Sequence, residues 1–82
     1  MKKSDWVFLD LETSGLNPLE DKIIEVAAVS LSADGTRKIY HQLVNPGIEV
    51  PEYITRLTGI ASGMVADAPF FDEIRASLLQ FL

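Results

Sequence analysis

Cysteine is absent from the 82-residue chain, which excludes disulfide bonds and thiolate metal sites. No apolar segment approaches the roughly 18 residues that a membrane-spanning helix requires, so we expect no association with a membrane. Lys2 and Lys3 precede an apolar run, but Asp10 and Glu12 interrupt that run before it is long enough for a signal peptide. Together, these absences predict a cytoplasmic protein.

Positive charge is scarce, because 7 Lys and Arg residues stand against 12 Asp and Glu residues and leave a net charge of −5. A chain of this charge does not coat nucleic acid, since that mode of binding depends on basic residues that displace counterions. An enzyme that acts on a nucleic-acid end is still allowed, because bound metal cations invert the local charge. The 48% of hydrophobic residues indicates one small globular domain.

Two carboxylates in a strand-like segment are the first functional signal. Asp10 and Glu12 are two residues apart within Val7–Glu12, so a strand presents both on one face. At a separation of about 7 Å they repel each other unless a cation lies between them. Because the segment is rich in Val, Phe and Leu, we expect it to be buried, where carboxylates are rare unless paired or bound to metal.

This pattern predicts a site for Mg²⁺ or Mn²⁺, because both ions prefer hard oxygen ligands. The alternative is an ordinary half-exposed strand, in which acidic residues also alternate with leucine. The spacing of Asp10 and Glu12 leaves both interpretations open.

Three strand-like segments joined by short loops predict an antiparallel meander. The first ends before a loop over residues 13–22, the second covers residues 23–31, and the third covers residues 38–44. The dipeptide Asp34-Gly35 is a hairpin signal between the second and the third. The second strand is apolar on both faces and is expected at the centre, which leaves the first strand with one neighbour and an exposed edge.

Helices follow the meander. Pro51 suits the first position of a short helix through Leu57, and Gly59 suits its end. Another helical turn is expected near residues 61–64, and Pro69 opens a longer helix that runs to the end of the chain. The fold class is therefore α/β, with a three-stranded antiparallel meander, a short helix and a longer C-terminal helix.

Four segments in order match a known pattern. Phe8–Leu16, followed by Asp21–Val29, resembles the first exonuclease motif of the DnaQ-like 3′→5′ exonucleases of the DEDD superfamily, and Leu43–Pro46 and Ile54–Ile60 resemble the next two landmarks. The resemblance implies a ribonuclease H-like fold, in which further strands run parallel to the first. Those parallel strands are missing here, so residues 1–82 are interpreted as the N-terminal, incomplete part of a single exonuclease domain.

The resemblance also implies roles for individual residues. The activity would be two-metal-ion hydrolysis of phosphodiester bonds at nucleic-acid 3′ ends, with Mg²⁺ or Mn²⁺ as cofactor. Asp10 would bridge both ions, and Glu12 would bind the one that carries the nucleophile. The substrate-binding residues would be Leu11, Thr13, Leu57, Thr58 and Gly59, of which the last three would line the pocket for the terminal nucleotide. A polymerase or another replication protein is an expected partner.

The chain departs from the family pattern in one respect. A complete member carries a second Asp in a motif like Asn-x-x-Phe-Asp, then a His or Tyr base and a fourth Asp, and none of these can be placed here. The chain alone is therefore expected to be inactive. His41 is interpreted as an ordinary strand histidine, and Glu25 as a hydrogen-bonded structural carboxylate, with a role behind the metal ligands as the alternative. Asp67, Asp72 and Glu73 are expected to face solvent or to complement the last helix's dipole.

Two other functions remain open. A non-catalytic interaction module would use the exposed edge of the first strand, and the same edge would allow a homodimer or a strand-swapped dimer. Another ribonuclease H-like nuclease or integrase would explain the acidic strand but not the segment Leu57–Ile60. The sequence does not distinguish a DNA substrate from an RNA substrate.

Overall fold

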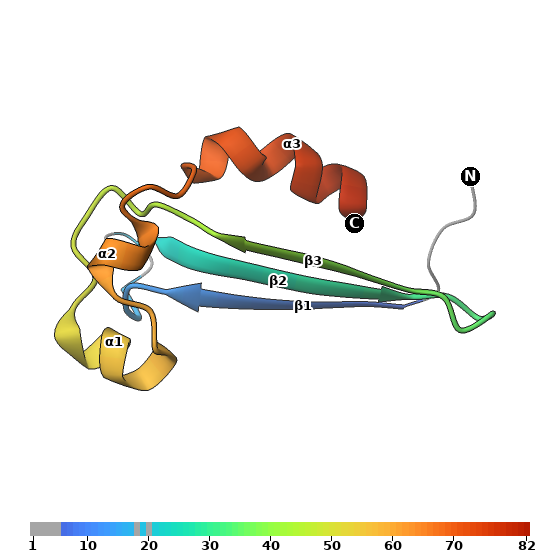
Figure 1. The fold of residues 1–82 in the computed structure, drawn as a ribbon, viewed down its shortest axis with the longest axis horizontal. Helices are drawn as coiled ribbons and strands as arrows, with labels where there is room; N and C mark the ends of the chain where they lie inside the picture. Colours follow the sequence, from blue (N-terminus) through green and yellow to red (C-terminus); the bar gives the residue numbers. More distant parts are fainter. Residues whose placement is uncertain (1–5, 18, 20) are drawn as a thin grey trace.

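The computed structural model describes residues 6–17, 19 and 21–82, in which three strands precede three helices (Figure 1). The strands are β1 (Trp6–Thr13), β2 (Ile23–Leu31) and β3 (Arg37–Leu43). The helices are α1 (Glu52–Thr58), α2 (Ser62–Val65) and α3 (Phe71–Phe81). All the predicted elements are present with their ends shifted by at most two residues, whereas Lys2 and Lys3 lie outside the described residues.

The two prolines lie just before the helices that they were expected to begin. Pro51 has ψ of 145°, so it caps α1 from an extended conformation and helical geometry starts at Glu52. Pro69 is followed by Phe70, which is also extended, and α3 starts at Phe71. In both cases the residue before the helix has helix-compatible φ but an extended ψ, so helical geometry begins one residue later.

The sheet is the predicted antiparallel meander, with the order β1-β2-β3 among the described strands. Its register places Asp10 opposite Ala27 and Glu12 opposite Glu25 on β2. Ala27 in turn lies opposite His41 on β3. The β1–β2 register shifts between Glu12 and Thr13, as it does at a β-bulge.

One face of the sheet is packed by α3, which lies over β2 and β3 (Figure 1). Ile74 and Leu78 of α3 form a buried cluster with Val26 and Val44. Tyr40 on β3 extends this contact, because its ring lies 5.6 Å from that of Phe81 and its hydroxyl lies 3.0 Å from Ser77 Oγ. This helix is therefore packed along the sheet.

A second cluster lies at the end of the sheet where β1 ends and β2 begins (Figure 1). Ile24 of β2 packs there against side chains from α1, α2 and the segments beside them, namely Val50, Ile54, Ile60 and Val65. Gly59 ends α1 with φ of 80°, a left-handed conformation that glycine adopts without steric cost. The predicted helix stop at Gly59 is confirmed.

The expectation that the first strand is buried is wrong. Trp6 is 65% exposed, Phe8 60% and Leu9 51%, because β1 is an edge strand and α3 covers its neighbours instead. Burial thus gives no support to a metal site at Asp10 and Glu12, and the case for it depends on their geometry. None of the helices in the described part of the chain is long and apolar enough to cross a membrane.

Candidate active site

Asp10 and Glu12 lie on the same face of β1, as the sequence predicts. Their partners Ala27 and Glu25 are on the β2 face that points away from α3, since the alternate residues of β2, such as Val26, pack against that helix. In Figure 1 no described helix covers the opposite face along most of the strands. Asp10 is exposed and Glu12 half-buried, so both carboxylates are accessible to solvent and ions from this open face.

Neither carboxylate is neutralised by a basic side chain within the described ranges. The ion pairs there join Glu25 to His41, Glu52 to Arg56 and Asp72 to Arg75. Two unpaired carboxylates on one open face fit a hard cation such as Mg²⁺ or Mn²⁺ by the chemistry of their donors. No group of three or more His, Cys, Asp or Glu residues among the described ones could hold a metal ion.

Hydrogen bonds made by Ser14 and Asp21, called here the Ser14–Asp21 clasp, hold together the loop after β1. The sequence did not predict them. Ser14 is fully buried, and its Oγ donates to Asp21 Oδ1 at 2.9 Å and accepts from the Lys22 N–H at 3.0 Å. The other oxygen of Asp21 accepts from the Asn17 N–H at 2.8 Å. Gly15 lies against the Asp21 carboxylate, where a side-chain carbon would collide with it. The clasp fixes the chain directly after Glu12, the place where the strand register shifts.

Thr13 and the end of α1 carry the other residues that were predicted to contact substrate. Thr13 Oγ1 donates to the Gly15 carbonyl at 2.6 Å, so its side chain belongs to the same loop. Leu57 is 79% exposed, and no atom lies within 4 Å of the position that a side chain on Gly59 would take. Thr58 Oγ1 donates to the Ile54 carbonyl at 2.8 Å. α1 and the end of β1 lie at the same end of the molecule (Figure 1), and the backbone at Gly59 is open to a ligand.

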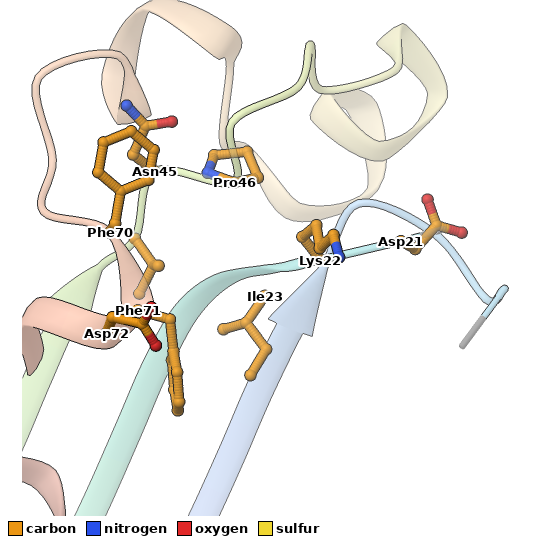
Figure 2. A pocket seen from close by; sticks show the side chains of 9 residues that line it. Asp21, Lys22, Ile23, Asn45, Pro46, Phe70, Phe71 and Asp72 are labelled. Carbon is orange, nitrogen blue, oxygen red and sulfur yellow. The ribbon is translucent and has the colours of Figure 1, made fainter. Parts of the chain in front are cut away.

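A pocket lies elsewhere, at the start of α3 (Figure 2). It has a volume of about 380 Å³ and contains none of the predicted site residues. Ile23, Phe70 and Phe71 supply its apolar lining, and Asp21 and Lys22 come from the loop before β2. The pocket thus lies between the loop before β2, the sheet and the start of α3.

Asn45, in the segment Leu43–Pro46 that resembles an exonuclease landmark, connects the backbone segments beside this pocket. Its backbone N–H donates to the Pro69 carbonyl at 2.8 Å, and its side chain donates to the Ala66 carbonyl at 3.1 Å. Its side-chain oxygen accepts from the Gly47 N–H at 2.8 Å. Asn45 thus connects the end of β3 to the segment that leads into α3, which is a structural role.

Glu25 and His41 are paired on the open face. His41 Nε2 lies 2.6 Å from Glu25 Oε2, which confirms the prediction that Glu25 is a hydrogen-bonded carboxylate. Sequence reasoning did not identify His41 as its partner, because the two residues come from different strands. The open face therefore carries Asp10, Glu12, Glu25 and His41 close to one another in the register.

Comparison with known proteins agrees with the resemblance to exonucleases. The RNase_T family profile, described as exonuclease, matches residues 7–82. The chain is 38% identical over 79 residues to a DNA polymerase III of the PolC type from Caldanaerobacter subterraneus, covering 96% of this chain and 6% of that protein. It is 34% identical over 83 residues to the 3′-5′ exonuclease DinG of Bacillus subtilis, covering 100% of this chain and 9% of that protein.

A solved structure has the same arrangement of strands and helices. It is Exonuclease X in complex with 5′ overhanging duplex DNA, with a TM-score of 0.74 and 25% identity, covering 88% of this chain and 42% of that one. The predicted ribonuclease H-like fold class is confirmed by this match. The chain spans less than half the length of each of these proteins.

Proposed function

The chain belongs to the RNase_T family of exonucleases, and from this membership we propose that residues 1–82 are the N-terminal part of a metal-dependent 3′→5′ exonuclease domain. The observation that carries the proposal is the pair of carboxylates on the open face of β1. Asp10 and Glu12 share that face and have no basic partner among the described residues. The direction of digestion is supported by the name of the DinG relative.

Each residue of the site has a role in this proposal. Asp10 and Glu12 would hold Mg²⁺ or Mn²⁺, which when bound activates water and stabilises the leaving 3′ oxygen. The Ser14–Asp21 clasp keeps the chain after Glu12 in place, and so keeps the two carboxylates in a constant relative orientation. The exposed side chain of Leu57 and the open backbone at Gly59 would contact the terminal nucleotide.

The remaining groups would come from outside these 82 residues. The chain covers 6% and 9% of the two relatives and 42% of the Exonuclease X chain, so most of each protein has no counterpart here. A concerted site does not function when several of its members are missing. We therefore propose that this chain alone is inactive and that a longer protein containing it hydrolyses DNA or RNA, in association with a polymerase or another replication protein.

A degradation assay tests this proposal. Single-stranded DNA and RNA, labelled at the 5′ end, would be incubated with the 82-residue chain and with a version extended by about 100 residues, the size needed to complete a domain. In Mg²⁺ or Mn²⁺ the extended version is expected to shorten labelled strands stepwise from the 3′ end, and the short chain is expected to leave them intact. Internal cleavage, or intact substrate with the extended version, would contradict the proposal.

The exposed edge of β1 supports a second candidate function, pairing with another copy of the chain. Among the described strands β1 pairs with β2 alone, and its backbone is unpaired on the other side. An antiparallel pair of β1 strands centred on Leu9 would place Asp10 opposite Phe8 of the second copy, so no carboxylates face each other. The outer edge of β3 is less suitable, because it carries Arg37 and Lys38.

We expect Leu9→Lys to weaken such a dimer at least tenfold, because two lysines would then face each other across the symmetry axis. Leu16→Lys is the matched control, since Leu16 is 98% exposed in the loop outside the strand. Sedimentation equilibrium of the 82-residue chain and both variants would measure the dissociation constants. A chain that stays monomeric at the highest concentration, or equal constants for both variants, would remove this candidate.

A further inference from the structure

Glu25 lies where a third carboxylate would disturb the candidate site. It is directly opposite Glu12 in the β1–β2 register, and both side chains are on the open face. Two like charges directly opposite each other across neighbouring strands are destabilising. The side chain of Glu25 is 26% exposed, so it is only partly screened by solvent. Some other group must determine which way this carboxylate points.

His41 is that group. It is on β3, on the far side of β2 from Glu12, and its Nε2 lies 2.6 Å from Glu25 Oε2. An ionised carboxylate only accepts hydrogen bonds, so Nε2 carries the proton and donates it. The bond therefore holds the Glu25 carboxylate toward β3 and away from β1.

We propose that His41 is a positioning residue that keeps Glu25 out of the metal site formed by Asp10 and Glu12. This inference rests on the proposed function, because it concerns the same site. With His41 in place, the cation has two carboxylates from β1 and space for the groups that complete the site. Without it, Glu25 is free to turn toward Glu12, where a third carboxylate adds both a ligand and negative charge.

The expected consequence of His41→Ala is tighter metal binding by the 82-residue chain. Added carboxylate ligands raise the affinity of a site for a hard divalent cation. We expect the dissociation constant for Mn²⁺ to fall about fivefold. A purely structural histidine would have the opposite effect, because its loss would loosen the sheet and weaken binding.

A double-mutant cycle separates these outcomes. Calorimetry with Mn²⁺ alone would compare the unmodified chain with His41→Ala, Glu25→Gln and the double variant. We expect Glu25→Gln to leave the affinity within about twofold and to cancel the effect of His41→Ala, since a neutral amide adds no charge at the site. His41→Gln, which keeps an N–H donor, is expected to resemble the unmodified chain. If His41→Ala does not fold, His41→Val, which suits a strand and has no donor, replaces it.

The position of the ring proton gives a readout that is independent of metal. Nitrogen NMR of the metal-free chain is expected to show neutral His41 protonated on Nε2, and loss of this preference in Glu25→Gln. Unchanged or weaker Mn²⁺ binding in His41→Ala, while Asp10→Asn abolishes binding, would overturn this inference and leave the proposed function intact. Absence of any binding that depends on Asp10 would overturn both.

Discussion

Replacement of Asp10 by asparagine in a complete exonuclease containing these residues is expected to lower kcat by about 10³-fold or more. Asparagine keeps the size of the side chain and one oxygen, but it removes the charge that would hold a divalent cation. In the proposed site, Asp10 would hold the metal together with Glu12, so its loss would weaken metal binding. A change of this size corresponds to about 4 kcal/mol in the activation free energy.

Asp34→Asn is the matched control for this substitution. Asp34 lies in the exposed turn between β2 and β3, and its pKa is below the ordinary value because the Thr36 N–H donates to it. Asparagine keeps an acceptor for that N–H, so Asp34→Asn is expected to leave kcat unchanged. The measurement is single-turnover degradation at saturating Mg²⁺, and comparable rates for Asp10→Asn and the control would refute the role of Asp10.

The elements could be predicted from the sequence because their signals are local. The nearly continuous apolar run Ile23–Leu31, rich in β-branched residues, indicates a strand without reference to any other segment. The positive φ of Gly59 and the fixed conformation of Pro51 depend on their own chemistry. The exposure of β1 could not be predicted, since the apolar content of Val7–Leu11 does not say which strands α3 covers.

In the candidate site, too, the features that depend on local spacing could be predicted and those that depend on distant residues could not. That Asp10 and Glu12 share a face follows from the two-residue period of a strand, which needs only their spacing. The partner of Glu25 is 16 residues away, and the pairing depends on the register across two strand pairs. The two residues of the Ser14–Asp21 clasp are 7 positions apart in a loop that has no repeating pattern. Their hydrogen bond therefore could not be predicted from the sequence.

Val26→Asp is expected to unfold the 82-residue chain. Val26 of β2 is 0% exposed and lies beneath α3, where it packs against Val44, Ile74 and Leu78. A carboxylate there would lose its hydration without gaining a partner, at a cost of more than about 4 kcal/mol. Small domains have a free energy of unfolding of only about 5–15 kcal/mol, and one of this size lies near the lower end.

The same substitution on the other face provides the control. Ile39 lies on β3, is 64% exposed and points away from α3, so Ile39→Asp is expected to change the free energy of unfolding by less than about 1 kcal/mol. Urea titrations followed by circular dichroism would measure both variants against the unmodified chain. If Val26→Asp unfolds at the same urea concentration as Ile39→Asp, the contact between α3 and the sheet does not stabilise the fold.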